Sequence, residues 1–408
     1  MTRALVIGAG VAGPVLAIAL QRIGIEALLF ERRPSLEHRG GSWLTFQANG
    51  MDALRALGIA EPVEALGFEL ETISFVNGKG RRLGRMPLAS PRADGQLSQM
   101  MRRDELYRTL THVAAEHGVG IATGKELVDA RVTPRGVEAL FADGDHATGD
   151  LLIGCDGIHS RVRTLIDPAA VPPRYVPVLN IGGHIPGFTV DVPPREFRMQ
   201  FGTRCFFAWM AAPDGGTVWF ANPPMAREPA DGVLSGLPDS QWRTWLHELM
   251  DGDVGPAPRI IDAAPGPLFG WATYDMPVVK HWSNERMIVI GDAAHATAPS
   301  AGQGAAMSLE DAVILAKCLR DTREIGEAFA LFESARRTRV ERIVKYGARS
   351  ANSKAAGPVA RRVRDAFLPV VFRRMERDGG RSMAWLQGHH IDFAEPMRSP
   401  AAAARMTL

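Results

Sequence analysis

The stretch GDAAHATAPSAGQG, at residues 291–304, combines an acid, a run of small residues and a proline. It follows the apolar run MIVI at 287–290, so Asp292 stands directly after an expected buried strand. From about Gln303 the sequence is typical of a helix. A carboxylate and a helix N-terminus bind polar or anionic groups. The stretch holds no obvious nucleophile and no metal-ligand spacing, which indicates a binding site rather than covalent catalysis.

A second stretch, GAGVAG at residues 8–13, fits the pattern G-x-G-x-x-G. An aliphatic run at 4–8 precedes it, a helix to about Arg22 follows, and 25–30 is a second apolar strand that ends at Glu31. This βαβ unit predicts a dinucleotide site. Its glycines allow a tight turn, a close approach to a pyrophosphate and close helix–strand packing, and the acid binds a ribose. The motif does not distinguish an FAD site from an NAD(P) site. Arg32 and Arg33, which follow Glu31, would also suit a 2′-phosphate.

Two further stretches lie between these motifs. DLLIGCDGIHSRVR, at 150–163, has a buried strand followed by Asp156, and RRDEL occupies 102–106. In their order along the chain, the stretches at 8–13, 102–106, 150–163 and 291–304 resemble those of the single-component flavin-dependent aromatic hydroxylases. These are the para-hydroxybenzoate hydroxylase-like group A monooxygenases. The resemblance extends to about residue 345. It implies bound FAD, NADPH or NADH as cosubstrate, and O2, with hydroxylation of an aromatic or polycyclic small molecule through a flavin C4a-hydroperoxide.

The resemblance also implies positions for the cofactor. Glu31 would hold the adenosine ribose, Arg103 the phosphates and ribityl chain, and Asp292 the ribityl and pyrophosphate region. The helix after the loop would aim its N–H groups at the flavin N1–C2=O edge, where reduced flavin is negative. The complete expected set is Gly8, Gly10, Val11, Ala12, Gly13, Glu31, Arg32, Ser42, Arg103, Leu127, Asp156, Asp292, Pro299, Gly302, Gln303, Gly304, Ala305 and Ala306.

Substrate residues are less well defined by the sequence. His184 is a candidate base because histidine titrates near neutral pH. Arg198 and Gln200 either point into the pocket or lie on the solvated face of a strand, since one sequence does not fix the register. Gln47 and the carbonyl of Pro299 are expected near the substrate. About half at most of six aromatic residues should face the pocket: Phe201, Phe206, Phe207, Trp209, Trp219 and Phe220.

The fold class expected is α/β, with a Rossmann-like FAD-binding domain of the GR2 type, an inserted antiparallel β-sheet substrate domain and C-terminal helices. The elements that position the motifs divide the chain into four parts. The FAD-binding domain is 1–70, 99–171 and 272–345, and the substrate domain is 71–98 and 172–271. A helical segment at 346–395, broken by Gly357-Pro358 and Pro369, precedes a flexible tail at 396–408.

Composition limits the class of protein. The chain has 408 residues and a net charge of +2, which argues against nucleic acid as the main partner. None of its three cysteines lies in a C-x-x-C pair, which favours a cytoplasmic location. A monomer or homodimer is expected, and the sequence does not decide between them. His389, His390 and Asp392 are expected in a surface tail, so no metal site is predicted. The Arg-rich residues 361–378 are interpreted as a solvated face, with an interfacial membrane helix as the alternative, so no stable membrane association is expected.

Two other functions remain open. A flavin halogenase or a reductase would use the same scaffold, but the W-x-W-x-I-P stretch of halogenases is absent. A non-catalytic FAD-binding protein would have no need of a loop that stabilises reduced flavin.

Overall fold

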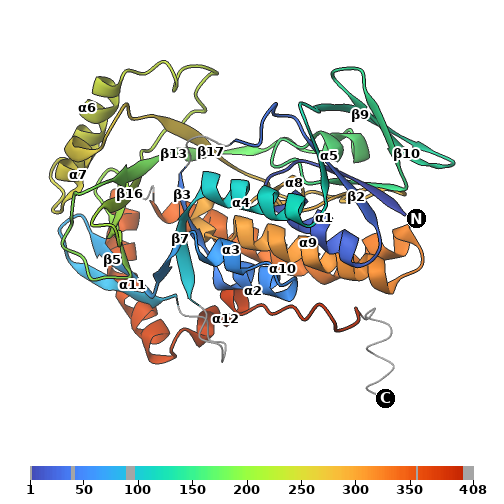
Figure 1. The fold of residues 1–408 in the computed structure, drawn as a ribbon. Coiled ribbons are helices and arrows are strands. Elements are labelled where there is room, and N and C mark those ends of the chain that lie inside the picture. Colours follow the sequence, from blue (N-terminus) through green and yellow to red (C-terminus); the bar gives the residue numbers. More distant parts are fainter. Residues whose placement is uncertain (1, 38–41, 89–96, 355–356, 398–408) are drawn as a thin grey trace.

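The computed structural model describes residues 2–37, 42–88, 97–354 and 357–397, so most of the expected tail at 396–408 lies outside the described residues. Figure 1 shows two sheet-based halves joined side by side, with long helices running beneath the N-terminal half. The N-terminal half contains the motifs of residues 8–13, 150–163 and 291–304. The other half contains the strands expected to cover the cofactor.

A five-stranded parallel sheet forms the centre of the first half, in the order β18-β12-β1-β2-β8. Helix α1 (Ala12–Arg22) connects the first two strands and confirms the βαβ unit within a residue or two. Strands β1, β12 and β18 are short, aliphatic and almost entirely buried, as parallel strands covered on both faces must be, whereas the edge strand β8 is exposed or half-buried. Their bounds are β1 (Arg3–Ile7), β2 (Glu26–Glu31), β8 (Gly120–Thr123), β12 (Leu151–Gly154) and β18 (Met287–Val289).

Helices cover this sheet and two small sheets extend it. Helix α9 packs on α1, α2 and α10, and its central turns are buried on every side. The three-stranded sheets have the orders β11-β10-β9 and β3-β7-β4. The elements are β3 (Trp43–Phe46), α2 (Ala48–Ala56), α3 (Glu61–Glu64), β4 (Phe68–Leu70), β7 (Ser98–Arg102), α4 (Arg103–Glu116), β9 (Leu127–Thr133), β10 (Gly136–Phe141), β11 (His146–Gly149), α5 (Arg161–Ile166), α8 (Asp292–His295), η1 (Pro299–Ala301), α9 (Gly304–Asp321) and α10 (Ile325–Lys354).

The second half is built on a seven-stranded sheet with the order β17-β13-β16-β15-β14-β5-β6. It contains the predicted antiparallel strands, and the hairpin at 72–87 is part of it. One pair differs from the prediction, because β5 and β14 run parallel. The elements of this half are β5 (Thr72–Asn77), β6 (Arg82–Pro87), β13 (Arg174–Ile185), β14 (Glu196–Phe201), β15 (Phe206–Ala211), β16 (Thr217–Asn222), α6 (Asp239–Met250), α7 (Ala257–Ala263) and β17 (Gly270–Asp275).

Helices pack on both faces of the seven-stranded sheet. Helices α6 and α7 bury Trp242 and Ile260 against one face. On the other face, helix α11 (Pro358–Arg377) stacks Phe372 on Phe75, with ring centroids 4.5 Å apart. The close approach requires Gly84, since a Cβ there would lie 2.3 Å from the Cβ of Phe372. After α11, the short elements η2 (Arg381–Met383) and α12 (Ala384–Gln387) return the chain to the first half.

The predicted break at Pro369 is wrong, because α11 continues through it. Proline lacks the N–H that would bond the carbonyl of Asp365, four residues earlier. That carbonyl instead accepts a hydrogen bond from Arg81 Nη2 at 2.7 Å. The Asp365 side chain also accepts from Asn77 Nδ2 at 2.9 Å. The turn of the hairpin therefore replaces the hydrogen bond that the proline removes.

Candidate active site

One large cavity, of about 750 Å³, lies between the two halves and is lined by both of them. Its wall in the first half comes from the glycine loop, the Asp156 loop and the loop 291–304. Its wall in the second half comes from the seven-stranded sheet and α11. Among the described residues, the charged side chains of the wall all belong to the first half: Arg32, Arg33, Arg103, Asp156 and Asp292, with His159 beside them.

The three glycines of the first motif have different surroundings. Gly8 has φ +104°, and a Cβ on it would lie 2.5 Å from the carbonyl oxygen of Cys155. A Cβ on Gly13 would lie 2.0 Å from the carbonyl oxygen of Gly8. These two positions serve the packing of strand, turn and helix. Around Gly10 a Cβ would meet nothing within 4 Å, and this residue lines the cavity with Val11 and Ala12. Gly10 thus leaves open the space that a pyrophosphate needs.

Glu31 holds the glycine loop in place. Its carboxylate accepts hydrogen bonds from the backbone N–H of Ala9 at 2.9 Å and of Arg33 at 3.0 Å. The side chain is buried, so it fixes the spacing between β2 and the loop whether or not a ribose is bound. Each oxygen keeps a further lone pair for a ribose hydroxyl.

The loop 291–304 leads from β18 into α9 along the cavity. Asp292 lies on it, and burial raises the pKa of this carboxyl, while Arg103 and His295 favour its charged form. A left-handed Gly302, with φ +61°, turns the chain after η1. Gly304 and Ala305 then begin α9 with their backbone at the cavity wall. The loop therefore places a carboxylate and a helix N-terminus at the same cavity. A carboxylate can bind the hydroxyls of a polyol, and a helix N-terminus can stabilise an anionic ring system attached to it.

Most of the other cofactor candidates also line this space. Ser42, Arg103, Asp156, Pro299 and Gln303 do so. Asp156 has a structural task as well, since its Oδ2 accepts from the backbone N–H of Arg161 at 2.7 Å at the start of α5. Its Oδ1 is buried and has no partner among the described residues. The same holds for Gln303 Nε2. Such buried polar atoms are costly unless something pairs with them, which fits a bound polar ligand.

Seven predicted residues do not line this wall. Gly8, Gly13 and Glu31 lie behind the part of the glycine loop that does. Leu127 is buried on β9, and Ala306 is buried on α9. His184, the candidate base, pairs with Asp214 at 3.1 Å and does not line the cavity. Arg198 lies on the opposite face of β14 from Phe197 and Met199, because side chains alternate along a strand. Its Gln200 neighbour, two residues on, shares that face.

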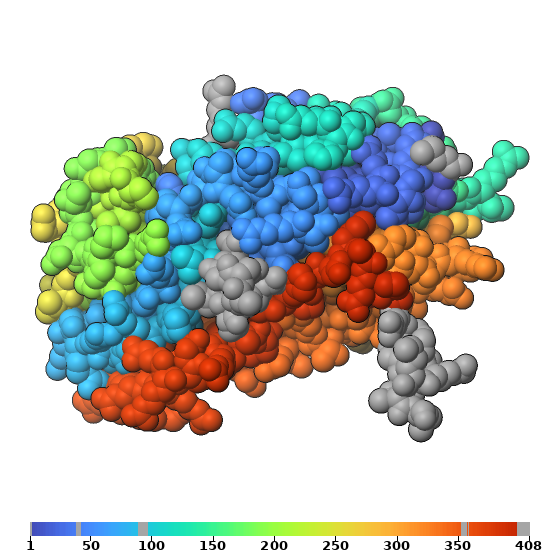
Figure 2. Space-filling view, turned by 60° about the horizontal axis from the view of Figure 1, so that its bottom comes forward, coloured from blue at the N-terminus to red at the C-terminus, as the bar shows by residue number. Residues whose placement is uncertain are grey.

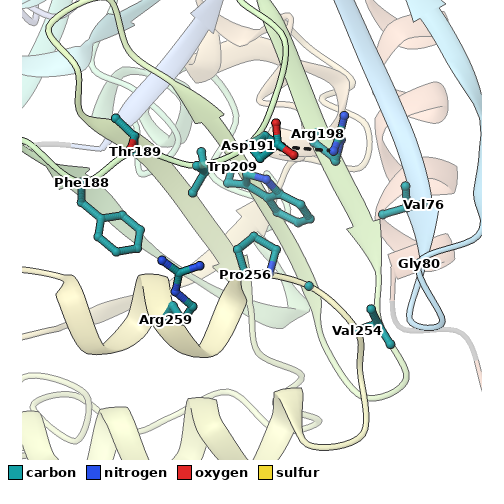
Figure 3. A pocket seen from close by; sticks show the side chains of 12 residues that line it. Val76, Gly80, Phe188, Thr189, Asp191, Arg198, Trp209, Val254, Pro256 and Arg259 are labelled. Atoms are coloured by element: carbon teal, nitrogen blue, oxygen red, sulfur yellow. Dashed lines mark hydrogen bonds between the residues drawn. The ribbon is translucent and has the colours of Figure 1, made fainter.

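Arg198 lines a second, smaller cavity of about 260 Å³ between α7 and the seven-stranded sheet (Figure 3). Its guanidinium pairs with Glu196 at 2.7 Å and donates to the carbonyl of Asp191 at 3.5 Å, the dashed line in Figure 3. Trp209 and Arg259 line the same space. A role of Arg198 in the large cavity thus has no geometric support.

A buried network that the sequence analysis missed fixes both ends of the loop 291–304. Asp311 on α9 accepts from the backbone N–H of Gly291 at 2.9 Å and from His295 Nε2 at 2.5 Å. Arg336 on α10 pairs with Asp311 at 2.6 Å and with Glu310 at 2.7 Å. All three charged side chains are fully buried.

The network reaches the other end of the loop through Asn49 on α2. Asn49 Nδ2 donates to Glu310 at 2.6 Å and to Gln303 Oε1 at 2.9 Å. Arg163 ties the loop to the Asp156 motif, since it donates to the carbonyl of Ala293 at 2.9 Å. The charged residues of the network, Glu310, Asp311 and Arg336, lie on helices α9 and α10, outside the sequence motifs. Their sole signal in the sequence is an acid pair and an arginine on otherwise apolar helix faces.

His390 and Asp392 lie at the surface as predicted, whereas His389 is partly buried. His390 Nδ1 lies 2.9 Å from Asp52 Oδ1, and His389 packs near Glu310. Burial lowers the pKa of His389 from its ordinary 6.5 to about 4; Glu310 opposes this change, whereas Arg339 and Arg336 reinforce it. Among the described residues, no group of three or more possible ligands is placed to hold a metal ion.

The depressed pKa of His389 predicts an acid-side loss of stability. The unfolded chain takes up a proton on this residue below pH 6.5, whereas the folded chain resists it until about 4. Stability is therefore expected to fall between those values, by at most about 3 kcal/mol. Urea unfolding near neutrality and near pH 5 would measure the loss, and His389→Gln should reduce it. An equal loss in that variant would contradict the assignment.

Comparison with known proteins agrees with this geometry. Residues 1–183 and 261–345 match the FAD binding domain family. The chain is 32% identical over 340 residues to aurachin C monooxygenase/isomerase of Stigmatella aurantiaca, which covers 81% of this chain and 84% of that protein. The chain belongs to the FAD-dependent aromatic monooxygenase family.

A second curated relative supports this assignment. The chain is 30% identical over 358 residues to 3-amino-4-hydroxybenzoate 2-monooxygenase of Streptomyces cremeus, with 86% of each chain covered. The fold matches Klebsiella pneumoniae HpxO, solved with FAD and uric acid, with a TM-score of 0.82 at 24% identity, over 95% of this chain and 97% of that one. Among the described residues no helix is long and apolar enough to cross a membrane.

Proposed function

We propose that this monooxygenase hydroxylates an uncharged, largely apolar aromatic molecule at FAD, with NADPH or NADH as reductant and O2 as co-substrate. One observation carries the substrate class. Among the described residues, the wall contributed by the seven-stranded sheet and α11 bears no Asp, Glu, Lys, Arg or His. A substrate carboxylate would lie there without a partner, and an unpaired buried charge is strongly disfavoured.

The apolar wall is extensive and adaptable. Strands β14 to β16 contribute aromatic rings, and methionines from several elements fill the gaps between them. Methionine suits ligands of irregular shape because its side chain is flexible and polarizable. The wall includes Ile73, Phe75, Met86, Phe197, Met199, Phe201, Phe206, Val218, Trp219, Phe220, Trp271, Leu368, Val371, Phe372 and Met375.

More aromatic residues reach this wall than strand alternation predicts. Four of the six aromatic candidates line it, although half at most were expected: Phe201, Phe206, Trp219 and Phe220. Trp219 and Phe220 are neighbours on β16, so their side chains should point to opposite faces. Gly183 lies opposite Trp219 on β13 and has no side chain. The indole stacks on Phe207, with ring centroids 5.5 Å apart, in the core on the face of α6 and α7, so Trp219 borders the cavity only beside this glycine.

The polar groups at this wall are neutral. Gln47 lies at the boundary with the flavin loop, since a Cβ on Gly302 would be 3.1 Å from Gln47 Nε2. Its Oε1 accepts from Ser98 Oγ at 2.9 Å, which leaves the amide N–H groups for the substrate or the loop. Asn180 and Asn222 lie deeper in the wall. We infer that these amides orient a substrate carbonyl, hydroxyl or ring nitrogen.

The residues of the first half fit FAD, with Gly10, Arg103, Asp292 and the α9 N-terminus on one continuous surface. When bound, FAD supplies electron transfer and oxygen activation, which no side chain provides. The chain excludes water from the apolar half, holds the ring against the loop 299–304, and stabilises negative charge at the start of α9. Gln47 and Pro299 are the proposed substrate contacts on the cofactor side.

The proposed function is tested by rapid mixing of the FAD-loaded protein with NADPH or NADH, followed at the flavin absorbance band. Uncharged bicyclic aromatics with an alkyl chain are compared with hydroxybenzoates. We expect a neutral compound to accelerate bleaching and to gain one oxygen atom. Bleaching that only a carboxylate accelerates would exclude the neutral class. No bleaching with any compound and either nicotinamide would exclude the reductant and favour a non-catalytic flavoprotein.

Leu368→Arg is expected to weaken binding of the neutral compound at least about tenfold, because it places a cation in the apolar wall. Phe367→Arg is the matched control, since Phe367 is the preceding residue of α11 and is 64% exposed. Ligand-induced change of the flavin spectrum gives both dissociation constants without turnover. Equal constants for the two variants would show that the ligand does not contact α11.

A further inference from the structure

Helix α11 has an exposed apolar stripe on the side that faces away from the cavity. Val359, Val363, Phe367 and Val370 are 75%, 64%, 64% and 63% exposed. Their spacing of four, four and three residues puts them on one face of the helix. Seven other large apolar side chains among the described residues are 37–63% exposed, but they are scattered over β9 and several loops. An aligned exposed stripe of this kind marks an interaction surface.

The stripe is flanked by positive charge. Helix α11 contains six arginines and two acids, a net charge of +4 over 20 residues. Both acids are engaged, since Asp365 accepts from Asn77 and Arg364, and Glu376 lies 3.7 Å from Arg82. Four arginines around the stripe are exposed and form no hydrogen bond or ion pair with the described residues: Arg362, Arg373, Arg374 and Arg377.

The helix is accessible in the molecule. In Figure 2 it lies along the lower edge of the visible face, in orange-red. Its inner side holds Leu368, Val371, Phe372 and Met375 at the wall of the large cavity. One helix thus has an inner apolar side toward the substrate space and an outer apolar side bordered by arginines.

We propose that α11 docks this monooxygenase reversibly on an anionic membrane surface, with its apolar stripe in the interface and its arginines on the lipid headgroups. An exposed apolar face flanked by arginines is what an interfacial helix presents to anionic lipid. A second copy of the chain fits less well, because two-fold pairing of this face would bring its arginines together without acids to neutralise them. Docking places the cavity wall beside the phase in which an apolar substrate accumulates.

The test is flotation of the FAD-loaded, full-length protein with vesicles. We compare phosphatidylcholine vesicles with phosphatidylcholine–phosphatidylglycerol vesicles, at low and high salt. The protein is expected to float with the anionic vesicles only, and less at high salt. Turnover is not measured, so the result stands apart from the proposed hydroxylation. No flotation with the anionic vesicles overturns the proposal.

Two variants of exposed residues examine the two parts of the surface. Phe367→Ser is expected to weaken vesicle binding about tenfold. The double variant Arg373→Gln/Arg374→Gln is expected to weaken it about 25-fold, roughly fivefold for each charge removed. Phe269→Ser is the matched control, because this phenylalanine is 61% exposed in a loop away from α11. Its binding should equal that of the parent, and flavin content verifies folding of all variants.

Self-association of the chain through the same stripe is tested by a separate measurement. Light scattering after size-exclusion chromatography gives the mass of the parent and of the variants without lipid. A dimer that Phe367→Ser converts to a monomer would overturn the proposal and assign the stripe to self-association. Flotation that is unchanged in both variants would overturn it as well.

Discussion

Gly10→Leu is expected to lower the affinity for FAD about 100-fold, which corresponds to about 2.7 kcal/mol, without destabilising the cofactor-free protein. The physical reason is that Gly10 borders empty space at the cavity: a Cβ there meets nothing within 4 Å. Its φ does not lie in the left-handed region, so a larger residue fits its backbone. The leucine side chain would occupy the space where the pyrophosphate approaches the loop. Fluorescence titration with FAD measures the affinity, and thermal unfolding of the apoprotein measures the stability.

Gly13→Ala separates packing from binding in the same loop. Its Cβ would lie 2.0 Å from the Gly8 carbonyl oxygen, so strand, turn and helix would have to move apart. We expect this variant to lose several kcal/mol of stability and to lose FAD as a consequence. If Gly10→Leu destabilises the apoprotein as much as Gly13→Ala, then Gly10 is a packing residue and its assignment to the pyrophosphate fails.

Arg336→Met is expected to destabilise the protein by about 3–5 kcal/mol, because it leaves Glu310 and Asp311 buried without their shared cation. All three side chains have no solvent exposure, and each acid contacts Arg336 within 2.7 Å. Burial on its own would raise the pKa values of Glu310 and Asp311, but Arg336 helps to hold both below their usual range. Denaturant unfolding measures the loss. FAD affinity should fall too, since the network holds Gly291 and Gln303.

Arg55→Met is the comparison for this variant. Arg55 also pairs with a glutamate, Glu64, but the two side chains are 42% and 32% exposed. Solvent screens such a pair, so its loss is expected to cost less than about 1 kcal/mol. An equal cost for the two variants would show that the buried network contributes no more than a surface ion pair.

The sequence by itself determined the cofactor half of this protein. The glycine loop, Glu31, Asp156 and Asp292 lie at turns between short apolar strands and helices, and local spacing fixes where such turns occur. Parallel strands meet at their carboxyl ends, so these residues converge without further information. The prediction of α1 within a residue or two has the same cause, because proline near a helix start and a buried apolar face are local signals.

Only the tertiary structure decided the substrate half, because its features depend on contacts between distant segments. The register of β14 against β5 and β15 placed Phe197 and Met199 in the cavity and Arg198 behind it, and a shift of one residue would exchange them. Pro369 was expected to end a helix, but Arg81, 284 residues away from Asp365, supplied the missing donor. The network of Arg336 likewise joins three helices. Sequence spacing carries no record of such partners, since their proximity arises only when the chain folds.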